Sequence, residues 1–183
     1  MKIYTKTGDQ GETGLLGGAR VDKNHAIIVA CGDVDETNSQ IGVAMSHGDA
    51  TEYAKQVFES VQRELFVVGT QLAGCTAETK PALSIEDSMV ERMEQQIDKV
   101  VAGLPALDAF ILPGGCSSAS QLHIARSVCR RAERSTVELI RTTELAYNLD
   151  QVVVYLNRLS DLLFVLARHE NSENRQAETK WLP

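Results

Sequence analysis

Residues 118–141 read SASQLHIARSVCRRAERSTVELIR, and this stretch decides the fold. Its apolar and small residues recur three or four positions apart, which is the repeat of one face of an α-helix. The residues on that face are Leu122, Ala125, Cys129, Ala132, Thr136 and Ile140. The spacing therefore predicts a long helix over about 118–141 that buries this face against other elements.

Four further segments show the same repeat. The predicted helices cover about 33–45, 53–73, 84–100 and 149–169. Asp33 and Glu36 resemble a capping box at the start of the first, and Ser117 and Ser118 are candidate caps for the helix over 118–141. Five helices joined by short connections are typical of a bundle. We therefore predict an all-α fold, a five-helix bundle with ferritin-like up-down packing.

Composition and charge exclude several classes of protein. A chain of 183 residues with 43% hydrophobic and 5% aromatic residues suits one helical domain over 1–183. The net charge of -7 disfavours binding to nucleic acid or to an anionic membrane. No apolar run approaches the roughly 18 residues of a membrane span, and no signal peptide is evident. The four cysteines form no CxxC pair, so we predict reduced thiols in a cytoplasmic protein rather than a metal site.

The first 24 residues differ in composition from the bundle over about 25–169. Five of the 13 glycines stand at positions 8, 11, 14, 17 and 18. Glycine lets backbone N–H groups wrap an anion, and Lys6 and Lys23 add positive charge. The patterns GxxxxGK[ST] and GxGxxG are absent. This loop is either a frayed terminus or an anion-binding segment, and the polar tail from about 170 to 183 is expected to fray.

Four of the 18 basic residues lie within nine positions, at Arg126, Arg130, Arg131 and Arg134. On a helix, Arg126 and Arg130 share a stripe with Glu133, whereas Arg131 points roughly 100° away. Guanidinium groups bind phosphate oxygens in pairs, and a nearby carboxylate can hold the arginines or meet a metal ion on the phosphates. The alternative is a solvated, salt-bridged helix face, which is what charge runs more commonly form.

The segment 149–169 also carries a polar stripe in an apolar environment, formed by Asn157, Asp161 and Arg168. Hydrogen bonds between helices explain such residues more often than a ligand does. Asp35 would form a partly buried ion pair if it faced the arginine helix. The residues 113–115, Pro-Gly-Gly, are interpreted as a sharp connection in preference to an anion site.

Five motifs together resemble those of the PduO-type ATP:cob(I)alamin adenosyltransferases. They are TKTGDQG at 5–11, VDETN at 34–38, FILPGG at 110–115, CRRAER at 129–134 and YLNRLSD at 155–161. They occur in the order that the family has. The resemblance implies a homotrimer of five-helix bundles with the active site between neighbouring subunits. It also implies transfer of the 5′-deoxyadenosyl group of ATP to the cobalt of cob(I)alamin, which yields adenosylcobalamin and inorganic triphosphate.

The resemblance further implies roles for individual residues. The implied ATP contacts are Thr5, Lys6, Thr7, Gly8, Thr13, Gly14, Lys23, Arg130, Arg131, Ala132, Glu133, Arg134 and Asn157. Magnesium would accompany ATP, with Glu133 as its protein contact. Asp35 and Arg126 would form a pair on the corrinoid side, and Phe110 would occupy the lower face of cobalt. The implied catalytic group is Asp35, Phe110, Arg126 and Arg130. Implied partners are a flavoprotein reductant and a cobalamin-dependent enzyme that accepts the product.

The sequence departs from the family pattern at a few positions. Cys31 stands where the family usually has tyrosine, Thr37 where it has leucine, and Asp22 where it has proline. These changes spare the charged residues of the motifs and concern corrinoid affinity and packing. They leave a second hypothesis open, in which the chain is a non-catalytic trimer that binds nucleotide and corrinoid as a sensor or delivery partner.

Overall fold

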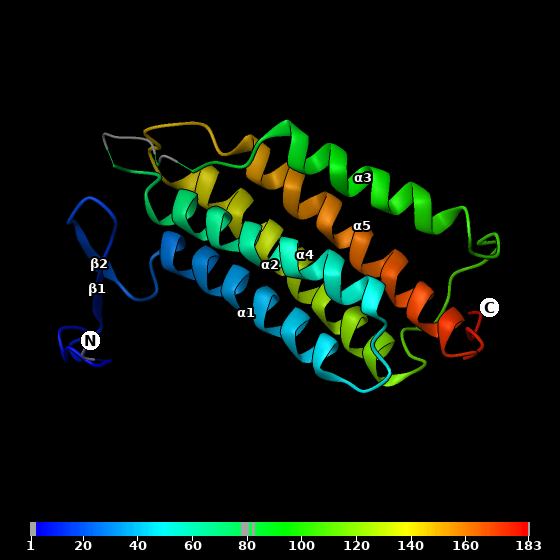
Figure 1. Ribbon diagram of the computed structural model, residues 1–183. Helices are drawn as coiled ribbons and strands as arrows, with labels where there is room; N and C mark the ends of the chain where they lie inside the picture. The colour runs from blue at the N-terminus through cyan, green and yellow to red at the C-terminus, as the bar shows by residue number, and fades with distance from the viewer. Residues whose placement is uncertain (1–2, 78–80, 82, 183) are drawn as a thin grey trace.

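The structure is a computed structural model that describes residues 3–77, 81 and 83–182, so residues 1–2 of the predicted N-terminal loop lie outside the described residues. Five helices and a two-stranded sheet follow one another along the chain (Figure 1). The strands are β1 (Glu12–Gly14) and β2 (Arg20–Asp22), and the helices are α1 (Ala26–Ser46), α2 (Glu52–Ala73), α3 (Asp87–Val101), α4 (Ser117–Thr142) and α5 (Asp150–Glu173). The predicted all-α, five-helix architecture is confirmed, with the small sheet as an addition.

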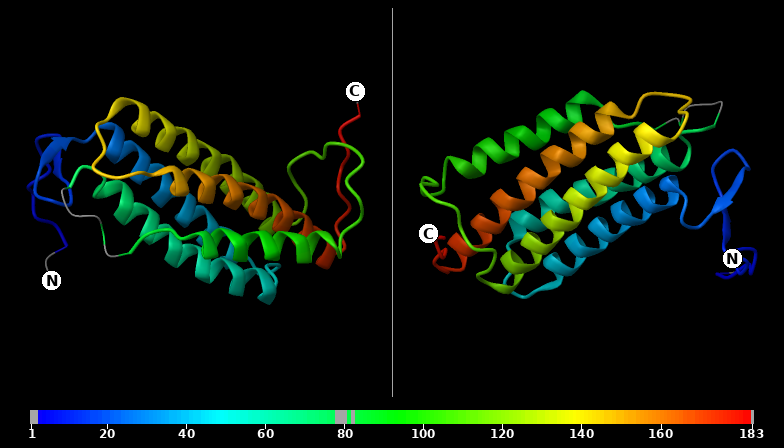
Figure 2. Two further views of the ribbon diagram at one scale, coloured as in Figure 1. Left: turned by 90° about the horizontal axis from the view of Figure 1, so that it is seen from above. Right: turned by 180° about the vertical axis from the view of Figure 1, so that it is seen from behind.

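The helices lie side by side along one long axis. α4 packs between α1 and α5, α2 packs on α1, and α3 lies on the outside against α5 (Figures 1 and 2). The sheet projects from the end of the bundle where α1 begins, and the C-terminus lies at the opposite end (Figure 1). Within the described ranges, no helix combines the length and the apolar character that crossing a membrane requires.

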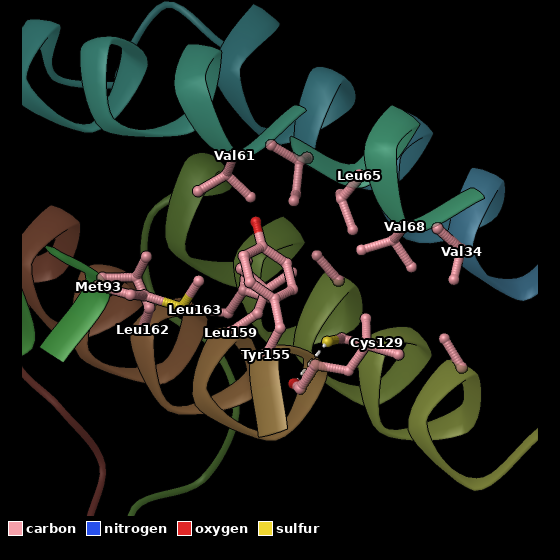
Figure 3. Close-up of a cluster of buried hydrophobic side chains, with 14 of the residues drawn as sticks. Val34, Val61, Leu65, Val68, Met93, Cys129, Tyr155, Leu159, Leu162 and Leu163 are labelled. Carbon is pink, nitrogen blue, oxygen red and sulfur yellow. Dashed lines mark hydrogen bonds between the residues drawn. The ribbon is translucent and has the colours of Figure 1, made fainter. Parts of the chain in front are cut away.

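The core is a continuous apolar cluster to which all five helices contribute. Its largest fully buried side chain is Tyr155, which points from α5 toward α2 (Figure 3). The Tyr155 hydroxyl donates a 2.8 Å hydrogen bond to Glu64, which also forms an ion pair with Arg92. A buried hydroxyl needs such an acceptor, because an unpaired polar group in the core costs about 1–3 kcal/mol. Burial and the neighbouring carboxylate raise the pKa of Tyr155 well above its usual value.

Two predicted helix starts are wrong. α1 begins at Ala26, two turns before the predicted start at Asp33, because the apolar run over 26–28 continues the helical face. Its N-cap is His25, whose Nδ1 accepts from the N–H of Ile27 at 3.3 Å. α3 begins at Asp87, one turn after Ser84, and its N-cap residue Glu86 is extended. The segment before α3 is held by a tertiary contact instead, a 2.7 Å bond from the N–H of Ile85 to Gln71.

The predicted caps of α4 are also wrong. Ser117 and Ser118 lie inside the helix, and Cys116 is the N-cap without a side-chain cap hydrogen bond. The carboxylate of Asp49, which follows α1, accepts from the N–H groups of Ser117 at 2.6 Å and Ser118 at 3.1 Å. A carboxylate at a helix N-terminus satisfies unpaired N–H groups and interacts favourably with the helix dipole. A residue remote in sequence therefore caps α4.

The predicted fraying after about residue 170 is wrong as well. α5 continues to Glu173, and Glu170 and Asn171 are buried. Arg175 has a positive φ of 54°, and the N–H of Gln176 bonds back to the carbonyl of Asn171 at 2.8 Å. This turn sends the last residues back along the connection between α3 and α4. The tail is thus part of the packed structure.

Replacing Glu170 with Ala should destabilise the fold markedly. The fully buried carboxylate accepts from the N–H and hydroxyl of Thr51 and from the hydroxyl of Ser118, so it ties together α2, α4 and α5. Loss of the acceptor leaves buried donors unpaired, and we expect a decrease of about 3 kcal/mol in the free energy of unfolding. Urea unfolding followed by circular dichroism measures it. The matched substitution Glu173→Ala, at an exposed position of the same helix, should change stability little.

Candidate active site

A row of arginines on α4 is the main feature of the candidate site. Arg126 is partly buried, and Arg130 and Arg134 follow it one and two turns later, both exposed. In the described part of the chain, none of these three guanidinium groups forms an ion pair or a hydrogen bond with a protein acceptor, and the Nε of Arg126 is buried without a partner. A salt-bridged helix face would pair these groups. The geometry therefore favours the hypothesis that the row binds an anion over the hypothesis of a salt-bridged surface.

Arg131 points away from this row, as the helical geometry predicts. Its Nε lies 2.9 Å from Asp33 Oδ1 on α1, and its Nη2 contacts Glu36. The hydrogen bond to Asp33 raises the pKa of Arg131 above its usual value. Ala132 is fully buried between the helices. Two of the implied ATP contacts on α4 therefore lie apart from the arginine row. Arg131 joins α4 to α1, and the side chain of Ala132 is buried.

His123 lies one turn before Arg126 and is also buried without a partner. Both ring nitrogens lack a hydrogen bond within the described chain, and the ring centroid lies 6.1 Å from that of Phe164 on α5. Burial and the positive charge of Arg126 lower the pKa of His123. The imidazole is therefore neutral near pH 7 and adds no charge to the arginine row.

Glu133 and Asn157 meet across α4 and α5. The Asn157 amide donates to Glu133 Oε1 at 3.1 Å, which fixes the carboxylate beside the arginine row. Among the described residues, no group of three His, Cys, Asp or Glu side chains is arranged to hold a metal ion. Mg²⁺ often binds proteins through one or two carboxylates together with substrate phosphates. A lone carboxylate beside unpaired arginines fits a magnesium ion that arrives on a phosphate ligand.

The N-terminal segment forms a hairpin rather than an irregular loop. β1 and β2 pair antiparallel, with Thr13 opposite Val21, and Gly17 and Gly18 in the turn have positive φ angles of 104° and 88°. These angles favour glycine, because a side chain would clash with the backbone. The hairpin places Lys23 beside Gly8, where a Cβ would lie 3.2 Å from the lysine Nζ. The Lys23 ammonium group and the Gly8 backbone are thus adjacent.

Asp35 lies on the other side of α1 from Arg131. It lines a groove of about 240 Å³ between α1 and α2, together with the exposed Phe66 and with Leu16 from the hairpin turn. In the described chain Asp35 has no ion pair, and the implied pair with Arg126 is not formed within one subunit.

Cys31 also lines this groove. Burial raises the pKa of its thiol to about 11, and the nearby Cys75 contributes. Alkylation requires the thiolate, so we expect the rate of Cys31 modification by iodoacetamide to rise about tenfold per pH unit from pH 7 to beyond pH 9. Free cysteine, with a pKa near 8.5, should level off earlier. Peptide mapping by mass spectrometry over this pH range measures the rate, and a plateau below pH 9 would contradict the burial argument.

Phe110 belongs to the connection between α3 and α4, and this connection lies at the end of the bundle opposite the hairpin (Figure 1). Its side chain is 77% exposed, and it contacts Trp181 edge-to-face with ring centroids 6.4 Å apart. Sequence reasoning missed Trp181 and the whole tail contact. The one signal was the apolar pair Trp181 and Leu182 at the end of a polar segment.

The single chain therefore brings together only some of the predicted site residues. Gly8 lies beside Lys23, and Glu133 beside Asn157. In the described structure no hydrogen bond or ion pair joins residues 3–24 to α4, and Phe110 lies far along the bundle from the hairpin. The hairpin, the arginine row and Phe110 are three separate features on one subunit.

The amino-acid sequence is similar to that of a known protein family. Residues 3–170 match the sequence profile of the family described as cobalamin adenosyltransferase. A cobalamin adenosyltransferase of Cupriavidus metallidurans is 44% identical over 182 residues, covering 98% of this chain and 94% of the relative. A corrinoid adenosyltransferase of Bacillus subtilis is 45% identical over 177 residues, covering 95% of this chain and 89% of the relative.

Solved structures agree with these sequence relatives. A variant PduO-type ATP:corrinoid adenosyltransferase from Lactobacillus reuteri, complexed with cobalamin and ATP, superposes with a TM-score of 0.91 at 36% identity, covering 98% of this chain and 96% of that one. A second variant from the same organism, complexed with ATP, gives a TM-score of 0.89. Sequence and fold agree over nearly the whole length, and the chain belongs to the cobalamin adenosyltransferase family.

Proposed function

We propose how this ATP-dependent corrinoid adenosyltransferase carries out its reaction: the arginine row and the N-terminal hairpin bind the triphosphate of ATP, while Phe110 controls the coordination of cobalt. The reaction transfers the 5′-deoxyadenosyl group of ATP to the cobalt of cob(I)alamin. Co(I) attacks the 5′ carbon, the carbon–oxygen bond to the triphosphate breaks, and adenosylcobalamin and inorganic triphosphate are released. The relatives that carry this activity in their names support the reaction.

The observation that carries the proposal is the set of unpaired arginines on α4. Negative charge grows on the triphosphate as the bond to the 5′ carbon breaks, and preorganised cations placed there lower the barrier. Arg130 and Arg134 have no protein carboxylate to neutralise them in the described chain. The nucleophile is the metal of the substrate, so the protein needs no general base. Its part in the chemistry is to orient ATP and to stabilise the leaving group.

We further propose that magnesium accompanies ATP and that Glu133 contributes one oxygen to it. Asn157 holds this carboxylate in place by its 3.1 Å hydrogen bond. A bound magnesium ion would add positive charge to the triphosphate. The remaining implied ATP contacts, Thr5 to Gly8, Thr13, Gly14 and Lys23, belong to the hairpin segment, whose open glycine backbone suits a phosphate ligand.

A homotrimer with the active site between subunits completes the proposal. In one chain the hairpin lies apart from α4, and Asp35 and Arg126 both lack partners within the described residues. A second copy could supply the missing neighbour in each case. Asp35 would then meet Arg126 of another subunit on the corrinoid side, and the hairpin of one subunit would close over the arginine row of the next.

Other expectations stay predictions. They are a cytoplasmic location, a flavoprotein that reduces cobalt, and a cobalamin-dependent enzyme that accepts the product. None of them is needed for the chemistry described above, because the reaction requires only ATP and a reduced corrinoid. Each therefore needs its own test.

The direct test of the function is incubation of the protein with ATP, magnesium and chemically reduced cobalamin. We expect the absorbance change of cobalt–carbon bond formation and release of triphosphate in equal amount. If ATP binds in calorimetry and no adenosylcobalamin forms, the second hypothesis holds, and the chain is a nucleotide-binding sensor or delivery partner. Omission of magnesium in a parallel reaction tests its role.

A further inference from the structure

The connection that carries Phe110 depends on the C-terminal part of the chain. Every hydrogen bond that the structure gives to residues 105–114 from outside the connection comes from α5 or from the residues after it. The N–H of Leu112 donates to the carbonyl of Thr179 at 2.8 Å, and the N–H of Trp181 donates to the carbonyl of Phe110 at 2.7 Å. Ile111 and Lys180 thereby form an antiparallel bridge. We call residues 178–181 the strap, which runs beside this connection in Figure 2.

A buried ion pair anchors the strap to the bundle. Arg168 on α5 is 5% exposed, and its Nε and Nη2 contact the two carboxylate oxygens of Glu178 at 2.8 and 3.1 Å. The same Nη2 donates to the carbonyl of Pro105 at 2.9 Å. A bidentate pair of this kind fixes orientation as well as distance. One guanidinium thus holds both the first residue of the strap and the start of the Phe110 connection.

Core packing does not set the position of the Phe110 ring, because Phe110 is 77% exposed and its neighbour Trp181 is 52% exposed. The contacts of the strap therefore matter for the position of Phe110. The neighbouring contact between Lys180 and Asp108 is an exposed ion pair, and such pairs contribute little. The Arg168–Glu178 pair is the one ion pair with a buried arginine between α5 and the strap among the described residues.

We propose that Arg168 and Glu178 are positioning residues for the reduction of Co(II) that precedes adenosyl transfer: their ion pair holds the strap, and the strap holds Phe110 at the corrinoid. The inference rests on the proposed role of Phe110. It adds a device that acts through Phe110. A displacement of about 1 Å in a positioned group can reduce turnover by up to about 10²-fold, so loosening the strap should affect the reaction strongly.

The test is Glu178→Gln, with Glu173→Gln as the matched control at an exposed position in the last turn of α5. Trp181 is the only tryptophan in the chain, so its fluorescence reports strap packing independently of activity. For Glu178→Gln we expect red-shifted emission and greater quenching by acrylamide. We also expect unchanged affinity for ATP, and turnover from Co(II) in the presence of a reduced flavin as electron donor that is lower by about tenfold or more. Turnover from pre-reduced Co(I) should stay close to that of the unmodified chain, and Glu178→Asp should restore part of the loss.

A double-mutant cycle separates positioning from a general loss of structure. In a Phe110→Ala background, Glu178→Gln should reduce turnover from Co(II) no further, because the side chain that the strap positions is already absent. Additive losses would overturn the inference, and so would altered fluorescence with a normal four-coordinate Co(II) spectrum. Unchanged fluorescence and turnover would overturn it too. If the unmodified chain makes no adenosylcobalamin, the proposed function fails, and the fluorescence still decides whether the pair holds the strap.

Discussion

Replacing Arg130 with Ala should lower the turnover of adenosylcobalamin formation by about 10² or more, because loss of one preorganised donor to a developing anion has an effect of this size. Arg130 is exposed on α4 and has no acceptor within the described chain, so the substitution breaks no protein contact that the structure shows. The loss should therefore appear in kcat with little change in the free energy of unfolding. Steady-state kinetics with cob(I)alamin, combined with thermal unfolding, measure both quantities.

Arg141→Ala is the matched control. Arg141 is also exposed on α4, in its last turn, and lies beyond the row formed by Arg126, Arg130 and Arg134. Its removal subtracts the same charge from the same helix and should leave turnover unchanged. Equal losses in the two variants would show that only the overall charge of α4 matters. Near-normal turnover of Arg130→Ala would remove the residue from the site.

Phe110→Ala should leave ATP binding intact and severely reduce turnover that starts from Co(II). If Phe110 excludes a lower axial ligand, its removal lets that ligand donate electrons to cobalt and makes Co(II) harder to reduce. Each decrease of about 59 mV in a one-electron potential lowers the reduced fraction about tenfold at a fixed reductant poise. The spectrum of Co(II) bound together with ATP should lose its four-coordinate signature. Absorbance and magnetic circular dichroism spectra measure this state.

Leu107→Ala controls for damage to the connection itself. Leu107 is 48% exposed on the same connection and makes no hydrogen bond through its side chain. Its truncation should leave the Co(II) spectrum and the turnover unchanged. A fully developed four-coordinate spectrum in Phe110→Ala would contradict the lower-face role. It would also remove the basis for the positioning role of the Arg168–Glu178 ion pair, since that pair is proposed to act through Phe110.

The ranges of most helices could be predicted from the sequence, whereas the starts of α1 and α3 and the group that caps α4 could not. Periodic burial is written in the local sequence, so the ranges of α2 and α4 agree with the structure within one residue at each end. Helix ends depend on what satisfies the terminal N–H and C=O groups. For α4 the acceptor is Asp49, far away in sequence, and no pattern around Ser117 could reveal it.

The arginines of α4 likewise have one property that the local sequence predicts and one that depends on tertiary contacts. Helical geometry predicted that Arg131 would point away from Arg126 and Arg130, and the structure confirms it. Which arginines are neutralised could not be predicted, because that depends on the carboxylates that α1 presents across the interface. The polar composition of the tail after about residue 170 predicts fraying, which the structure does not show. Its order comes from Glu170 and Arg168, whose polar groups find buried partners only in the folded chain.

By itself, the sequence determined the number of helices, the faces that they bury, and the residues that carry the family motifs. These properties follow from local spacing and residue type. Only the tertiary structure decided that the hairpin and Phe110 lie at opposite ends of the bundle, that Asp35 and Arg126 do not meet in one chain, and that the tail holds the Phe110 connection. Contacts between residues distant in sequence decide these relations, because a side chain's partner is set by how whole helices pack and not by its neighbours along the chain.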